Sequence, residues 1–118
     1  MSFDPRNCIQ FMHHAGFIVK DLDKSLDFYV NKLGFDLKMR WIETAEQCQP
    51  GMGNPGGDLE LAQMVGYGAM VEISQYLHCA GSDAPIEPNR IGVGHVSFEV
   101  NDLPALVEYL TAQGVQLA

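Results

Sequence analysis

The first third of the chain shows two successive patterns of apolar and polar residues. Residues 11–20 alternate with a period of two, which predicts a strand with Phe17 and Val19 on one face. Asp21 then suits a helix N-cap, and apolar residues recur at helical spacing until Gly34. The pattern therefore predicts a strand followed by an amphipathic helix.

Three further strands are predicted after this helix. Residues 35–42 alternate between apolar and charged side chains, and residues 59–65 and 69–77 are largely apolar runs joined by a tight turn at residues 66–68. Between them, residues 43–57 hold four Gly and two Pro. This composition predicts a long loop, either a binding loop or a connection without a role.

The end of the chain repeats the beginning. Residues 94–100 have the pattern of a strand, Asp102 suits a helix N-cap, and Gly114 follows the predicted helix. Two segments that lie 81 positions apart share five identities within nine residues, a sign of a repeated structural unit. The identical pairs are His14 and His95, Phe17 and Phe98, Val19 and Val100, Asp21 and Asp102, and Leu22 and Leu103.

The repeat distinguishes His14 and His95 from the other histidines. Both have the strand parity opposite to the apolar residues that would pack under a helix, so both are expected on the other sheet face. His13 has the wrong parity and no counterpart, and we interpret it as structural or solvent-exposed. In the strand 69–77 the same alternation places Glu72 on the face of His14.

Two imidazoles and a carboxylate on one sheet face make a candidate site for a divalent metal. The candidate ligands are His14, Glu72 and His95. A carboxylate inside a half-apolar strand is costly to bury unless it is paired or bound to a cation. Each residue alone also fits a simpler role, as a hydrogen-bonded strand histidine or a glutamate at a wet edge. Arg40 and Tyr76 are weaker candidates for binding an anionic substrate group.

Composition limits the classes of function. The 118 residues suit a single domain, and a net charge of −8 with only 7 Lys and Arg excludes a nucleic-acid partner. No apolar run is long enough for a membrane span and no signal peptide is evident, so we expect a cytoplasmic protein without a membrane partner. Cys8, Cys48 and Cys79 are widely spaced and predict reduced thiols.

Three segments together resemble the glyoxalase/bleomycin-resistance/extradiol-dioxygenase family, the vicinal oxygen chelate superfamily. They are "HHAGFIVKDLDKSLDFYVNKLGF", "MVEISQY" and "GHVSFEVNDLPALVEYLTAQGV". The resemblance covers nearly the whole chain and implies an α+β fold of paired βαβββ modules around a metal and substrate cavity. It implies one glyoxalase-like domain at 1–118, with a first module at 11–77 and the start of an incomplete second module at 92–118.

The resemblance also implies a site and a chemistry. The family's ligand positions fall on His14, Glu72 and His95, which implies a divalent metal ion such as Zn, Ni, Mn, Co or Fe. A carboxylate at position 72 is most similar to lactoylglutathione lyase-like proteins. This implies a metal-dependent lyase or isomerase that acts by proton transfer on a small oxygen-chelating substrate, with Glu72 also as catalytic carboxylate.

Other members of the superfamily leave alternatives open. These are an extradiol ring-cleaving dioxygenase, a methylmalonyl-CoA epimerase-like enzyme and a metal-free bleomycin-resistance-type binding protein. The second module lacks three strands, including the one that would carry a fourth ligand, a glutamate. The chain is then a piece of a longer protein, one half of a cavity shared with a partner, or a short form. We expect a homodimer, because the second helix would leave apolar residues exposed, and weak or absent lyase activity.

Overall fold

The computed structural model describes residues 2–44, 46, 57–78 and 80–117. The chain divides into two compact units, residues 1–81 and 82–118. None of the helices in the described ranges has the length and apolar character that a bilayer crossing requires.

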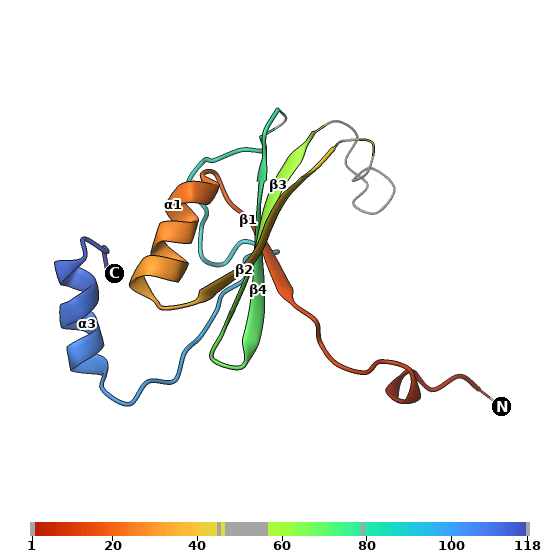
Figure 1. Cartoon of the computed structure of the whole chain (residues 1–118), viewed down its shortest axis with the longest axis horizontal. Helices are drawn as coiled ribbons and strands as arrows, with labels where there is room; N and C mark the ends of the chain where they lie inside the picture. Colours follow the sequence, from red (N-terminus) through yellow and green to blue (C-terminus); the bar gives the residue numbers. More distant parts are fainter. Residues whose placement is uncertain (1, 45, 47–56, 79, 118) are drawn as a thin grey trace. The chain divides into compact units, whose positions relative to one another are not determined.

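The first unit is a four-stranded mixed sheet with a helix over one face (Figure 1). Its strands are β1 (Ala15–Ile18), β2 (Asp36–Glu43), β3 (Leu59–Gly66) and β4 (Ala69–Tyr76), in the spatial order β1-β4-β3-β2. β1 runs parallel to β4, and the other neighbours are antiparallel. The helical elements are η1 (Pro5–Asn7), α1 (Leu22–Leu26) and the π-helical η2 (Asp27–Lys32). The expected α+β class is confirmed, and this unit has the element order βαβββ.

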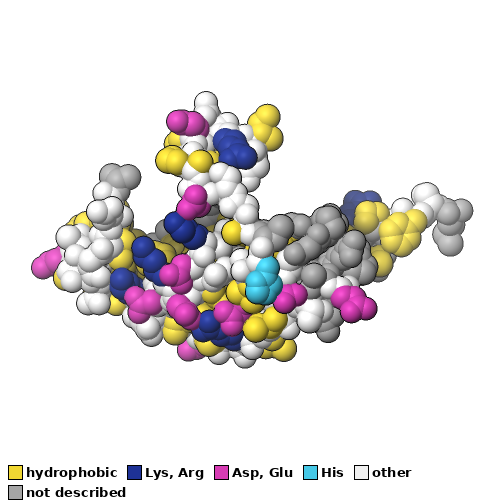
Figure 2. Space-filling model, turned by 90° about the horizontal axis from the view of Figure 1, so that it is seen from above, with side chains coloured by type: hydrophobic (Ala, Val, Ile, Leu, Met, Phe, Trp, Pro, Cys, Tyr) yellow, Lys and Arg dark blue, Asp and Glu magenta, His cyan; other side chains and the backbone are white. Residues whose placement is uncertain are grey.

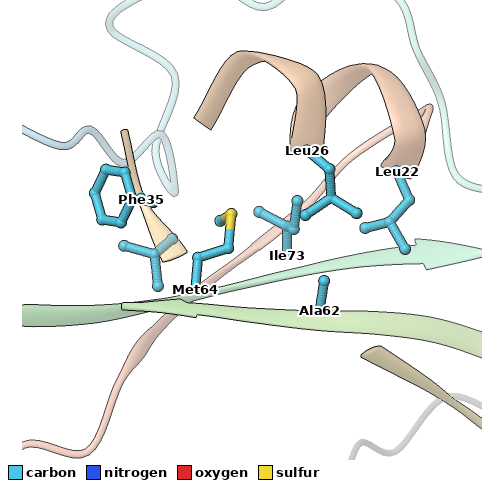
Figure 3. Close-up of a cluster of buried hydrophobic side chains, with 7 residues drawn as sticks. Leu22, Leu26, Phe35, Ala62, Met64 and Ile73 are labelled. Atoms are coloured by element: carbon cyan, nitrogen blue, oxygen red, sulfur yellow. The ribbon is translucent and has the colours of Figure 1, made fainter. Parts of the chain in front are cut away.

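The hydrophobic core lies between α1 and the sheet. Leu22 and Leu26 point from the helix towards Ala62, Met64 and Ile73 on the strands (Figure 3). The apolar residues that recur at helical spacing between Asp21 and Gly34 belong to this core or pack against it; they are Leu22, Leu26, Tyr29, Val30 and Leu33. The helical periodicity of the sequence therefore identified the buried face correctly.

The start of α1 is fixed by two side chains from different parts of the chain. Asp21 Oδ1 accepts a hydrogen bond from the Lys24 backbone N–H at 3.1 Å, as expected for an N-cap. Gln75 Oε1, on β4, accepts from the Leu22 backbone N–H at 2.8 Å. The second bond joins the helix to the strand that carries Glu72.

The substitution Asp21→Ala is expected to lower the free energy of unfolding by about 1 kcal/mol, because an N–H of the first turn loses its acceptor. Urea denaturation followed by circular dichroism measures the change. Asp21→Ser keeps an acceptor oxygen and should stay close to wild type. Equal stabilities for the two variants would contradict a capping role.

A bulge in β2 changes the face of its later residues. Leu37 pairs with Met64, but Met39 pairs with Gln63, so Lys38 is an extra residue in the ladder. Leu37 therefore shares the helix side with Met64, whereas Met39 lies on the opposite side with Gln63. Strict alternation over residues 35–42 does not predict this shift.

The β3–β4 hairpin closes through a two-residue turn. Tyr67 and Gly68 have φ angles of 54° and 77°, the left-handed conformation that a tight hairpin turn requires. The turn fixes the register, so that Gly66 pairs with Ala69 and Gln63 pairs with Glu72.

The second unit contains α3 (Leu103–Ala112). Asp102 Oδ1 caps it by accepting from the Ala105 backbone N–H at 3.0 Å, and Gly114 follows with a φ of +82°. The helix and its cap are as predicted.

Two strand predictions were wrong: one predicted strand is absent, and another is shorter than predicted. Residues 94–100 carry no strand pairing. In the first unit β1 is held by β4, and the described part of the second unit offers no strand for the equivalent pairing. The first strand was expected over residues 11–20 and spans only Ala15–Ile18, the part that pairs with β4.

Other expectations fall partly outside the described residues. Cys8 is free and exposed, as expected of a reduced thiol, whereas Cys48 and Cys79 lie outside the described ranges. The same holds for most of the predicted loop at 43–57. The module limits 11–77 and 92–118 stay predictions.

Candidate functional site

Glu72 lies in the middle of the sheet, on the face opposite α1. Its neighbours in β4, Val71 and Ile73, are 4% and 0% exposed and belong to the core under the helix. Because successive strand residues alternate in direction, Glu72 points to the other face, where its side chain is 18% exposed. Gly16 of β1 and Gln63 of β3 pair with it on either side.

Each oxygen of the Glu72 carboxylate has a different neighbour. Gln63 Nε2 donates a hydrogen bond to Oε1 at 3.1 Å. His14 Nε2 lies 3.3 Å from Oε2, farther than the about 2.9 Å of an ordinary N–H···O bond. A Cβ at Gly16 would lie 3.9 Å from this second oxygen, an ordinary van der Waals distance, so β1 passes close to Oε2. The oxygen Oε2 is therefore the one that faces the imidazole of His14.

The His14 ring has a second neighbour in His13. The two Nδ1 atoms are 2.8 Å apart, a hydrogen-bond distance, and the rings meet edge to face at 79°. His13 in turn stacks on Phe11, with ring centroids 6.0 Å apart. The expectation that His13 is solvent-exposed is correct, but it contacts the candidate site and is not an isolated surface residue.

Apolar side chains surround this face of the sheet. Leu59 and Leu61 of β3 are buried and pack with Trp41 and Tyr76. Towards the hairpin, an open cavity of about 370 Å³ is lined in part by His13 and the apolar Met70. Its volume falls within the range of small-molecule pockets, about 300–1,000 Å³.

Arg40 is not part of this face. Its guanidinium donates to Glu60 at 3.0 Å and to Asp23 of α1 at 2.7 Å, which places it on the helix side of the sheet. The hydrogen bond to Glu60, and then that to Asp23, raises the pKa of Arg40 above its ordinary value. The alternative role of Arg40 as an anion-binding residue is therefore not supported, because two carboxylates already bind it.

The structure brings together two of the three predicted metal ligands. His14 and Glu72 lie on one sheet face with a nitrogen and an oxygen 3.3 Å apart, a donor pair suited to a divalent cation. His95 belongs to the second unit. Within the described ranges, no group of three or more His, Cys, Asp or Glu residues is arranged to hold a metal. The three-residue set therefore stays a prediction.

Sequence reasoning missed two residues of this site. Gln63 contacts Glu72 directly, and the tight turn at residues 66–68 contained the signal, because its geometry fixes which residues of the hairpin face each other. The alternation of apolar and polar residues could not predict the contact of His13 with His14, because it applies only within a regular strand. His14 lies just before β1 begins at Ala15.

Charges on the surface are mixed. On the face seen in Figure 2, lysine and arginine side chains lie among acidic ones and do not gather in a single patch. Two ion pairs of the described residues are Arg6 with Asp4 at 3.0 Å and Lys32 with Asp27 at 3.5 Å.

Comparisons with known proteins agree on one family. The model of the Glyoxalase/Bleomycin resistance protein/Dioxygenase superfamily matches residues 11–118. The lactoylglutathione lyase of Schizosaccharomyces pombe is 29% identical over 88% of this chain, which spans only 37% of that relative's length.

Solved structures of glyoxalase proteins have a similar fold. A glyoxalase family protein from Bacillus cereus is 26% identical with a TM-score of 0.75, covering 90% of this chain and 73% of its own. The trypanothione-dependent glyoxalase I of Leishmania major is 22% identical with a TM-score of 0.64, covering 90% and 68%, and supports the fold alone. With its βαβββ unit and a family match over residues 11–118, the chain belongs to the glyoxalase/bleomycin resistance protein/dioxygenase superfamily.

Proposed function

We propose that this chain forms part of a metal-dependent lyase or isomerase that moves a proton on a small oxygen-chelating substrate. The observation that carries the proposal is the pairing of His14 Nε2 with Glu72 Oε2 at 3.3 Å on the sheet face opposite α1. The similarity to a lactoylglutathione lyase supports this choice among the superfamily's reactions.

Three residues of the chain are proposed to hold a divalent cation. His14 supplies an imidazole nitrogen, Glu72 supplies Oε2, and His95 supplies the third donor from the second unit. When bound, such a cation supplies Lewis-acid polarisation of neighbouring substrate oxygens and makes an adjacent C–H more acidic. These ligand types suit Zn, Ni, Mn, Co and Fe, so they do not select one of these metals.

Glu72 is proposed to be the catalytic carboxylate as well as a ligand. Its Oε1 is held by Gln63, which restrains rotation of the carboxylate and keeps Oε2 towards His14. When it is not bound to the cation, Oε2 would be the atom that receives and returns the substrate proton.

A homodimer remains our prediction for the assembly. Phe98 and Val100, on the apolar side of the repeat in the second unit, are 43% and 39% exposed. A second copy of the chain would bury such side chains.

The proposed reaction class is tested by assays on the metal-loaded chain. We expect isomerisation of a hemithioacetal formed from a 2-oxoaldehyde and a thiol, at a low rate, and no oxygen uptake with catechols. Oxygen uptake with Fe(II) and a catechol would instead indicate a dioxygenase, for which two His and one carboxylate are the common ligand set. Turnover of acyl-CoA thioesters alone would indicate an epimerase.

A further inference from the structure

His13 and His14 form an imidazole pair at the edge of the candidate site. Their Nδ1 atoms are 2.8 Å apart, so one nitrogen must donate a proton and the other must accept it. If both Nδ1 atoms carried a proton, two donors would meet, and if neither did, two lone pairs would meet. The position of the proton on one ring therefore depends on its position on the other ring.

Glu72 determines which nitrogen donates. His14 Nε2 lies 3.3 Å from a carboxylate oxygen, which favours a proton on Nε2 when no cation is present. Neutral His14 then has a bare Nδ1, and His13 must carry its proton on Nδ1. Phe11 stacks against His13, with planes 29° apart, and helps to hold the ring in this orientation.

We infer that His13 is the positioning residue of His14: its Nδ1 hydrogen bond orients the His14 ring so that Nε2 faces Glu72. This inference rests on the proposed metal site. It assigns His13 as the hydrogen-bond partner of the proposed ligand His14. Partners of this kind around metal-binding histidines fix the ring and its tautomer.

A divalent cation on His14 Nε2 would leave Nδ1 as the nitrogen that carries the His14 proton. The hydrogen bond to His13 would then be kept with its direction reversed.

Two variants separate the hydrogen bond from the ring stack. His13→Phe keeps an aromatic ring for Phe11 but has no nitrogen, whereas His13→Asn keeps a short side chain that can donate or accept. Because His13 is exposed and outside the core, neither substitution should unfold the chain. Co(II) titration followed by absorbance should show an affinity about tenfold or more weaker in His13→Phe, with recovery in His13→Asn.

Imidazole ¹⁵N NMR at mildly alkaline pH tests the same inference in the metal-free chain. We expect a proton on Nδ1 of His13 and on Nε2 of His14, and a changed His14 Nδ1 shift in His13→Phe. Unchanged His14 resonances in His13→Phe would overturn the inference. A wild-type chain that binds no Co(II) would overturn the metal site instead, and the NMR result would still decide the role of His13.

Discussion

The substitution Glu72→Ala is expected to weaken Co(II) binding by more than about 100-fold. Loss of a residue that only supports a ligand costs about 10–100-fold in metal affinity, and loss of the ligand itself should exceed that. Glu72 provides the carboxylate of the proposed site, and among the described interactions only Gln63 and His14 contact its oxygens. Titration of the purified variant with Co(II), followed by absorbance, measures the change.

Glu60→Ala is the matched control for this variant. Glu60 lies on β3, one strand away, and its carboxylate binds Arg40 on the helix side of the sheet. Its removal should leave Co(II) affinity unchanged. A similar loss in both variants would mean that the stability of the sheet, and not the carboxylate on the face opposite α1, controls metal binding.

Ile73→Ala is expected to give the largest loss of stability, about 3–4 kcal/mol in the free energy of unfolding. Ile73 is fully buried between the sheet and α1, where Leu22 and Leu26 contact the same cluster (Figure 3). The truncation leaves a cavity that the helix and strands cannot fill without moving. Against a total of about 5–15 kcal/mol for ordinary domains, this is a large fraction.

Ile42→Ala serves as the comparison for the core variant. Ile42 is in β2 and 56% exposed, so the same change of side chain should cost less than about 1 kcal/mol. Urea denaturation of both variants gives the two values. If they differ by less than 1 kcal/mol, the core between α1 and the sheet does not have the packing described above.

Local chemistry made most of the first unit predictable. Asp21 could be identified as a cap because it precedes a helical apolar pattern, and its side chain does cap α1. The turn at residues 66–68 could be identified from its two glycines, and it sets the register that pairs Gln63 with Glu72. Both features depend on residues close together in the chain.

The bulge in β2 shows what alternation does not predict. Phe35 and Trp41 have the same parity in the sequence, yet Phe35 packs under the helix and Trp41 packs with Leu61 on the other face. The extra residue Lys38 reverses the direction of the later side chains. Nothing in the local sequence requires a bulge there, because it depends on pairing with β3.

The candidate site depends on contacts between distant residues. Parity placed His14 and Glu72 on one face, and the structure brings them together through the parallel pairing of β1 with β4. The pairing of β1 with β4 depends on tertiary structure. The parity of two residues in their strands says which face they share, but not how far apart they lie. The strand expected at residues 94–100 is absent for the same reason, since a strand needs a hydrogen-bonded neighbour as well as a suitable pattern.

The most direct test of the proposed site is the metal content of the purified protein after loading with Zn(II) and dialysis. It should be measured for wild type, His14→Ala, His95→Ala and the control His78→Ala, whose imidazole is exposed and 3.5 Å from Asp58. The proposed site predicts near-stoichiometric metal in wild type and His78→Ala, and loss in His14→Ala and His95→Ala. Absence of metal in wild type, or its retention in both of the latter variants, would contradict a site built on these histidines.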